Sequence, residues 1–175
     1  GDIGGDFARK MKALGAYTIG VRRTDREKPE YLDEQYTMDK LDELLPRADI
    51  VAMVLPGGPA TNHLMDERRL HLMKPGSYLI NVGRGNAIDP KALYDVLKEG
   101  YLNAAAIDVT EPEPLPEGDP LWELGNLVIT PHVAGNFFLP ETFERIIRIA
   151  GSNLRAWCSG EPLKNVVDFT TGYRK

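Results

Sequence analysis

The feature that most constrains the fold is a set of short apolar runs separated by segments whose apolar residues recur at helical spacing. Apolar runs without alternating polar residues are typical of parallel strands that helices cover on both faces. Gly or Pro stands near most of the boundaries, where such elements commonly end. The strand–helix order repeats and predicts an α/β fold with a mainly parallel sheet. The predicted strands are residues 17–21, 50–54, 78–82, 104–107 and 127–130.

The segments with helical spacing carry, at their ends, the residues that helix ends favour. Asp89 followed by Pro90 is a good helix start, because Asp caps the first N–H groups and Pro fits the first turn. We assign residues 1–160 to one domain and treat 161–175 as a tail that follows it. The predicted helices are 4–14, a short helix after Thr37, 66–73, a helix from Asp89 to near Gly100, and 141–158.

Composition and charge exclude several classes of function. The net charge of −5 disfavours broad binding to nucleic acid or to an anionic membrane, since both need a cationic face. No apolar run approaches the roughly 20 residues that cross a bilayer. The single cysteine excludes an internal disulfide and favours a reducing cytoplasm, and with three scattered histidines it suggests no metal site. We therefore expect a cytoplasmic protein that binds neither nucleic acid nor membrane.

Half of the dinucleotide-binding fingerprint G-x-G-x-x-G opens the chain. Its second glycine lets the backbone approach a pyrophosphate, and its third lets the following helix pack against the sheet. The pyrophosphate would sit on the helix N-terminus, where free N–H groups and the helix dipole favour an anion. A helix that merely begins at Gly4 is the alternative interpretation. The residues concerned are Gly1, Asp2, Ile3 and Gly4.

The first glycine of the fingerprint and the strand before it do not occur in these 175 residues. In a doubly wound sheet of the Rossmann type, that strand is central and has neighbours on both sides. We therefore expect the natural protein to be longer, and this chain to lack the first strand of its sheet. Another strand or another chain should then cover the open edges, because exposed edges promote aggregation.

The end of the strand that follows the first helix indicates which form of the cofactor is bound. NAD enzymes place Asp or Glu there, about 20 residues after the glycines, to bind the ribose hydroxyl groups. This chain has Arg22, Arg23 and Thr24 instead. A carboxylate would repel a 2′-phosphate, whereas arginine offers it a planar donor fork. The pattern favours NADP(H) over NAD(H), and the alternative is a solvated basic turn that also includes Arg26 and Lys28.

Three polar segments follow three successive predicted strands. The first carries Arg84, the second carries Asp108, Glu111 and Glu113, and the third carries His132. The carboxyl ends of parallel strands meet at one edge of the sheet, which is where open α/β sheets bind ligands. We therefore expect these side chains to lie close together.

Together with the opening glycines, these segments resemble the signature of the D-isomer-specific 2-hydroxyacid dehydrogenases, and the resemblance spans essentially the whole chain. It implies that Arg84 binds the substrate, that His132 is the general acid and base, and that Glu113 is its carboxylate partner. It also implies that Asp108 lies near the nicotinamide carboxamide and that Gly135 lets the chain pass close to the nicotinamide. The other residues that would line the cofactor are Leu55, Pro56, Thr61, Val82 and Gly83.

The chemistry of a 2-oxoacid suits these side chains. Its carboxylate and ketone lie on adjacent carbons, and the planar fork of Arg84 can hold both. A hydride from the nicotinamide adds to the ketone carbon while His132 protonates the forming alkoxide. Glu113 beside the imidazole favours its charged form, but Glu111 is close enough in sequence to be the partner instead. Taken singly, an arginine or histidine in such a loop is more often structural than catalytic.

The sequence thus predicts an NAD(P)-dependent 2-oxoacid reductase or D-2-hydroxyacid dehydrogenase of the glyoxylate or hydroxypyruvate type. Phosphoglycerate, lactate or another 2-hydroxy acid is an alternative substrate. A non-catalytic dinucleotide-binding regulatory module is an alternative of another class, although such a module needs no proton donor, and Arg22 disfavours a methyltransferase. The resemblance further implies that residues 161–175 are the returning stub of a substrate domain, and that the protein is a homodimer. This chain alone should turn over little or no substrate.

Overall fold

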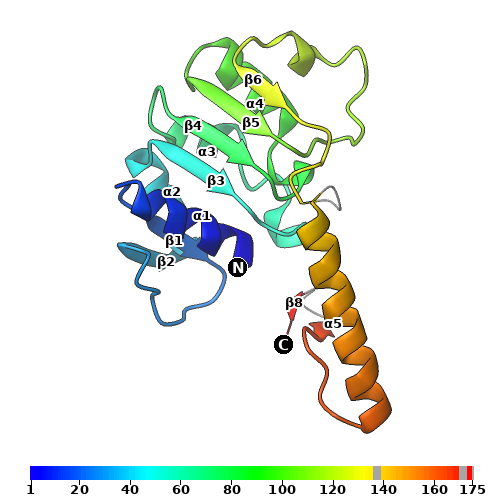
Figure 1. Ribbon diagram of the computed structural model, residues 1–175. Helices are drawn as coiled ribbons and strands as arrows, with labels where there is room; N and C mark the ends of the chain where they lie inside the picture. The colour runs from blue at the N-terminus through cyan, green and yellow to red at the C-terminus, as the bar shows by residue number, and fades with distance from the viewer. Residues whose placement is uncertain (136–138, 170–172, 175) are drawn as a thin grey trace. The chain divides into compact units, whose positions relative to one another are not determined.

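Strands and helices alternate through most of the chain, as the sequence predicts (Figure 1). The computed structural model describes residues 1–135, 139–169 and 173–174. They belong to two compact units, Gly1–Ala134 and Gly135–Lys175. The elements of the first unit are α1 (Asp2–Ala13), β1 (Ile19–Arg22), β2 (Glu34–Thr37), α2 (Leu41–Leu44), β3 (Ile50–Met53), α3 (Glu67–Leu72), β4 (Tyr78–Asn81), α4 (Pro90–Lys98), β5 (Ala104–Ile107) and β6 (Leu127–Ile129), with short 3₁₀ turns at Met38–Lys40, Leu45–Arg47, Pro59–Thr61, Gly85–Ala87 and Pro120–Glu123.

Strands β3 to β6 form one parallel sheet in which the spatial order follows the chain. Its register pairs Ile50 with Tyr78, Tyr78 with Ala104, and Ala105 with Leu127. All four strands begin where the sequence predicts and end at the predicted residue or one residue earlier. Continuous apolar runs are therefore reliable signals for the strands of this sheet.

Strands β1 and β2 form a separate parallel pair, with Ile19 opposite Glu34. The predicted strand 17–21 is present but lies two residues later at its start. No strand was predicted for β2, because its residues Glu34 to Thr37 mix polar and aromatic side chains after a charged stretch. Within residues 1–135, strands of this pair do not hydrogen-bond to the larger sheet. The predicted doubly wound sheet is thus formed as two parallel sheets.

A groove of about 170 Å³ lies where side chains of the two sheets approach each other. Its lining includes Ile19 and Val21 of β1, Val51 and Met53 of β3, and Leu44 of α2, all apolar. The two halves of the first unit therefore meet here through side chains and not through a shared strand ladder.

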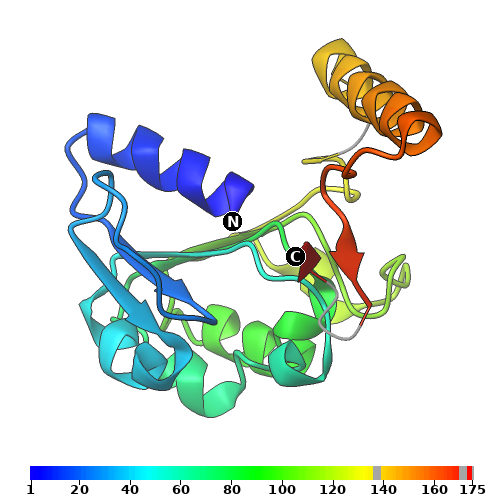
Figure 2. The same ribbon diagram turned by 90° about the horizontal axis from the view of Figure 1, so that it is seen from below.

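Helices lie on both sides of these strands, as Figure 2 shows, with α1 on one side and α2, α3 and α4 on the other. Helix α4 begins as the sequence predicts, because Asp89 accepts hydrogen bonds from the N–H groups of Lys91 and Ala92 and Pro90 occupies the first turn. It ends before Gly100, whose φ of +71° is easily adopted by glycine. The helix buries four apolar side chains, including that of Val96.

The hydrophobic core belongs almost entirely to the larger sheet and its helices. Leu70, Leu79 and Val96 are fully buried there. Within residues 1–40, by contrast, only Thr18 and Leu32 are buried, and α1 has no buried side chain. Burial is therefore concentrated beneath the strands that carry the predicted chemistry.

The second unit contains α5 (Pro140–Ser159) and two short antiparallel strands, β7 (Val167–Asp168) and β8 (Tyr173–Arg174). Helix α5 agrees with the predicted helix 141–158 to within one residue at each end, and Gly160 closes it in the left-handed conformation. Most apolar side chains of α5 are exposed in the described chain, including Trp157. The boundary between the two compact units falls between Ala134 and Gly135. The division into a domain of residues 1–160 and a substrate-domain stub of residues 161–175 stays a prediction.

Candidate active site

The loops that follow β4, β5 and β6 leave the same edge of the sheet, as expected for parallel strands. Main-chain hydrogen bonds continue the ladder past the strand ends, from Asp108 N to Asn81 O (2.9 Å), from Thr130 N to Ile107 O (3.0 Å) and from His132 N to Asp108 O (2.8 Å). Each loop therefore starts from a position that the sheet determines.

Arg84 lies in a tight turn after β4, between two glycines that pack against neighbouring main chain. A Cβ atom on Gly83 would lie 2.5 Å from the carbonyl oxygen of Leu55, and one on Gly85 would lie 1.9 Å from that of Thr110. Only glycine fits at either place. The exposed Arg84 side chain donates from Nη1 to Gly83 O (2.7 Å), and the remaining guanidinium donors can serve a ligand.

His132 and Glu113 come from two different loops and form a pair. The distance from His132 Nδ1 to Glu113 Oε1 is 2.6 Å, and the side chains are 45% and 41% exposed. His132 has a φ of +54°, a left-handed conformation that is costly for a residue with a Cβ atom. With Glu113 ionised, the proton of the neutral ring resides on Nδ1 and Nε2 is left for a substrate.

The neighbouring glutamate makes a different pair. Glu111 Oε2 lies 2.9 Å from His63 Nε2 in the loop after β3. The structure thus brings Glu113, and not Glu111, against His132, which the sequence could not decide. The sequence does not predict the contact between His63 and Glu111, and no residue pattern indicates the left-handed φ of +44° at His63.

Asp108 is buried at the end of β5 and holds the loop that carries His132. Its carboxylate accepts hydrogen bonds from the hydroxyl of Thr130 and from the N–H groups of Val133 (3.0 Å) and Ala134 (2.9 Å). Burial alone would raise the pKa of Asp108, but these hydrogen bonds and the nearby His132 hold that pKa below its ordinary value. The contact of Asp108 with a nicotinamide carboxamide stays a prediction.

The N-terminus of α1 has the features of an anion site. Gly1 is the N-cap, no side chain caps the helix, and the first helical hydrogen bond runs from Gly5 N to Gly1 O. The N–H groups of the first turn, on Asp2, Ile3 and Gly4, therefore have no partner within the helix. A Cβ atom on Gly4 would lie 2.9 Å from a methyl group of Val54, as expected for a glycine at a close helix–strand contact.

The predicted 2′-phosphate residues lie at and just after the end of β1. Arg22 is the last residue of β1, and its Nη1 atom makes a long hydrogen bond of 3.4 Å to Gln35 Oε1. Arg23 and Thr24 follow at exposed positions. Because its hydrogen bond is long, the Arg22 side chain can reorient toward a bound anion at low energetic cost.

The predicted cofactor-lining residues of the loops after β3 and β4 lie together. The hydroxyl of Thr61 donates to the carbonyl oxygen of Pro56 (2.9 Å), which closes the loop on itself. Leu55 contacts Gly83 through main-chain atoms, and Val82 N donates to the last residue of β3 (3.1 Å). Gly135 opens the second unit and is described apart from them.

Residues 1–135, 139–169 and 173–174 contain no group of three or more His, Cys, Asp or Glu side chains placed to hold a metal ion. No helix among these residues is long and apolar enough to cross a membrane. Cys158 is exposed on α5.

The family-level comparison covers the whole of the first unit. The profile of the family described as "D-isomer specific 2-hydroxyacid dehydrogenase, NAD binding domain" matches residues 1–134. That range contains Arg84, Glu113 and His132 together with the α1 N-terminus. The chain belongs to this family. The family resemblance noted in the sequence is therefore confirmed, whereas the roles of single residues stay predictions.

Individual relatives agree with this assignment. A glyoxylate reductase of Korarchaeum cryptofilum is 39% identical over 171 residues, which cover 96% of this chain and 50% of the relative. A D-isomer specific 2-hydroxyacid dehydrogenase of Xanthobacter autotrophicus, solved with NADPH and MES, is 35% identical, with a TM-score of 0.89 over 99% of this chain and 69% of that one. An NADPH-dependent glyoxylate/hydroxypyruvate reductase of Sinorhizobium meliloti, solved with NADP and sulfate, is 31% identical, with a TM-score of 0.86 over 96% of this chain and 53% of that one. The chain spans about half the length of the curated relatives it matches.

Proposed function

We propose that this chain is the cofactor-binding half of an NADPH-dependent reductase of small 2-oxoacids such as glyoxylate or hydroxypyruvate. The observation that carries the proposal is the His132–Glu113 pair, 2.6 Å apart, at the sheet edge that also presents Arg84. A regulatory dinucleotide module has no use for a proton donor held by a carboxylate, so the pair favours an enzyme. The glyoxylate and glyoxylate/hydroxypyruvate reductases among the relatives support the substrate class.

The side chains then divide the work of a ketone reduction. Arg84 holds the carboxylate and the ketone oxygen through its planar fork and so orients the carbonyl group. NADPH, when bound, supplies the hydride that adds to the carbonyl carbon. His132 donates a proton from Nε2 to the carbonyl oxygen as the C=O π bond breaks, which leaves a neutral imidazole and a 2-hydroxy acid. The half-exposed imidazole regains its proton from water, and the reverse sequence oxidises the hydroxy acid.

Glu113 acts through His132. Its carboxylate accepts the Nδ1–H, which leaves Nε2 to carry the proton that is donated to the substrate. It also fixes the plane of the ring, and the main-chain bonds of Asp108 fix the loop beneath it. Both effects keep Nε2 directed to one place, which a proton transfer over hydrogen-bond distance requires.

The residues of the cofactor-binding half fit NADP(H). The uncapped α1 N-terminus would hold the pyrophosphate, and Arg22 with Arg23 and Thr24 would hold the 2′-phosphate. Two of the similar structures contain NADPH or NADP, which supports the same preference. We further propose that the full-length protein is a cytoplasmic homodimer, with the apolar side chains of α5 available for its contacts.

The cofactor proposal is tested by titrating the chain with NADPH and NADH and following nicotinamide fluorescence. We expect tighter binding of NADPH, and we expect Arg22→Asp to weaken it about ten- to a hundredfold while changing NADH binding little, since a charged hydrogen-bond donor contributes ~1.5–3 kcal/mol. Arg26→Asp is the matched control from the same basic stretch. Equal losses in both variants would support a diffuse basic turn instead of a 2′-phosphate site.

The reduction itself is tested in the full-length protein, because this chain alone should turn over little or no substrate, by following NADPH oxidation in the presence of glyoxylate. We expect His132→Asn to lower the rate by a factor on the order of 10²–10⁴, the usual contribution of a positioned proton donor. His71→Asn is the control, because His71 lies on α3 and hydrogen-bonds to the main chain of its own helix. Equal rates for wild type and His132→Asn would reject the proposal.

A further inference from the structure

Asn81, the last residue of β4, is a buried polar side chain to which neither the sequence nor the proposed reaction assigns a role. It is only 1% exposed. Its Oδ1 atom accepts a hydrogen bond from Gly83 N (2.9 Å), and its Nδ2 atom donates one to Arg84 O (2.9 Å). The two ends of a single amide thus bind the main chain before and after the Cα atom of Arg84.

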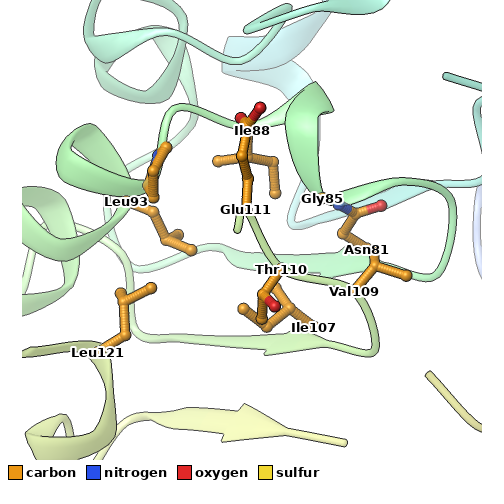
Figure 3. Close-up of a pocket in the computed structure, with 10 residues that line it drawn as sticks. Asn81, Gly85, Ile88, Leu93, Ile107, Val109, Thr110, Glu111 and Leu121 are labelled. Carbon is orange, nitrogen blue, oxygen red and sulfur yellow. The ribbon is translucent and has the colours of Figure 1, made fainter. Parts of the chain in front are cut away.

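The surroundings leave this turn little freedom. Gly83 is pressed against the main chain of Leu55 and Gly85 against that of Thr110. Figure 3 shows Asn81 beside Gly85 at the edge of a small cavity. The cavity measures about 10 Å³, space for roughly one water molecule.

We propose that Asn81 is a positioning residue that directs the guanidinium of Arg84 toward the substrate. The inference rests on the proposed function, in which Arg84 binds the carboxylate of a 2-oxoacid. Without the amide, the buried N–H of Gly83 loses its partner and the carbonyl of Arg84 keeps only its bond from Ala87 N (3.2 Å), so the turn rearranges to recover the lost bonds. A guanidinium displaced by even about 1 Å loses its bidentate geometry.

A second asparagine in the same unit provides the comparison. Asn126 also donates from its side chain to main-chain carbonyls, those of Leu97 (3.0 Å) and Asn103 (3.5 Å). Those bonds join α4 to the turns around β5 and β6 and contact no residue proposed for binding or catalysis. Replacing either asparagine therefore removes a side-chain donor to main-chain carbonyls, but only in the case of Asn81 is one of those carbonyls that of Arg84.

The experiment compares the full-length protein as wild type, Asn81→Leu and Asn126→Leu by NMR titration, with NADPH alone and then with oxamate in the presence of NADPH. Oxamate is a stable analogue that carries the carboxylate and carbonyl of a 2-oxoacid. We expect Asn81→Leu to raise the Kd of oxamate about tenfold, in line with the loss of one well-formed hydrogen-bond pair, and to change the Kd of NADPH much less. Asn126→Leu should leave both constants near the wild-type values.

Hydrogen exchange of the Gly83 amide adds a readout that needs no ligand. It should be slow in wild type and in Asn126→Leu, and faster in Asn81→Leu. Should Asn81→Leu fail to fold, Asn81→Asp replaces it, because that isosteric change keeps the acceptor for Gly83 and removes the donor to Arg84; its oxamate Kd should still rise.

The outcomes separate the two proposals. An unchanged oxamate Kd in a folded Asn81 variant, or equal losses for oxamate and NADPH, would overturn the positioning role. Wild-type protein that binds NADPH but no oxamate would overturn the proposed function instead, and with it the substrate-directed role of Asn81. In that case, faster exchange of the Gly83 amide in the variant still supports a role for Asn81 in holding the Arg84 turn. Unchanged exchange would overturn that role as well.

Discussion

The sheet formed by β3 to β6 and the pair formed by β1 and β2 are both parallel, but they differ in how deeply they are buried. The larger sheet packs against α3 and α4 around fully buried side chains such as Leu70, Leu79 and Val96. Every residue of β1 and β2 is only half-buried, and α1 buries none of its side chains. The larger sheet carries Arg84, Glu113 and His132, whereas the smaller pair and α1 carry the residues proposed to bind phosphate groups.

The difference corresponds to two kinds of binding. Proton transfer and bidentate recognition need atoms held to within about half an ångström, which a dense core beneath the strand ends can provide. An anion at a helix N-terminus, or beside an exposed arginine, is held by charge and dipole over a broader range of positions. Dense packing is thus found where geometry decides the chemistry, and the lighter packing lies where electrostatic attraction is sufficient.

Leu79→Ala should show the difference most clearly. Removal of a fully buried leucine from β4 should lower the free energy of unfolding by about 2–5 kcal/mol. Leu32→Ala, at a buried position in the lightly packed half, should cost clearly less, because its neighbours can close around the gap. Urea unfolding of both variants measures the two values. Equal costs would mean that the two regions share one cooperative core.

Two glycines sharpen the comparison at the level of single contacts. Gly85→Ala places a methyl group against the carbonyl of Thr110, which is main chain and cannot move aside, so the expected cost is about 1–3 kcal/mol or more. Gly4→Ala meets only the methyl group of Val54, which can shift. The Tm of Gly85→Ala, measured by thermal unfolding, should therefore be well below that of Gly4→Ala. A reversed order would contradict the rigidity assigned to the Arg84 turn.

Asp108→Asn tests how firmly the His132 loop is held. Loss of the charge weakens the hydrogen bonds from Val133 and Ala134, and we expect a decrease of about 1–3 kcal/mol in stability. Amide exchange at those two residues should become faster. Asp89→Asn is the control, since asparagine caps a helix about as well as aspartate. If exchange at Val133 and Ala134 stayed slow, another contact would have to hold this loop.

The smallest expected effect is a loss of stability at acid pH, which arises from two carboxylates in the lightly packed half. A hydrogen bond from Lys12, followed by one from Thr18, lowers the pKa of Asp33 to about 2, and Arg47 with its neighbours lowers the pKa of Glu34 to about 2. Because these values lie below the ordinary 3.8 and 4.5, the charged pairs stabilise the fold above about pH 4.5 and lose that effect as pH falls through about 2.

The expected loss is small because these carboxylates are close to solvent. Urea midpoints measured at pH 5 and pH 2.5 should differ less for Glu34→Gln than for wild type, since glutamine does not titrate. The comparison between the regions would need revision if Glu34→Gln had the full wild-type dependence on pH.

The success of the sequence analysis follows the same division. The strands of the larger sheet were predicted closely because a core strand buried on both faces must be apolar throughout. Strand β2 was missed because half-buried residues such as Glu34 and Tyr36 need no such pattern. The long helix α5 was predicted from its apolar spacing, but spacing cannot tell what its exposed side chains contact.

The candidate site was predictable in its residue types and not in its contacts. Arg84 and His132 could be placed at one edge because parallel strands end together. The choice between Glu111 and Glu113 could not be made, since two residues of sequence separate them and each meets a different histidine. The amide of Asn81 bonds to main chain two and three residues away, and such contacts depend on backbone angles that residue identity alone does not specify.

The separation of the two sheets has a consequence for how a bound dinucleotide would act on the protein. A cofactor that extends from Arg22 to His132 would contact both the β1–β2 pair and the β3–β6 sheet, which share no strand ladder. Binding energy would then appear as added resistance to unfolding in the lightly packed part, in proportion to the logarithm of cofactor concentration above its Kd. The cofactor would thus stabilise the folded protein as well as take part in the reaction.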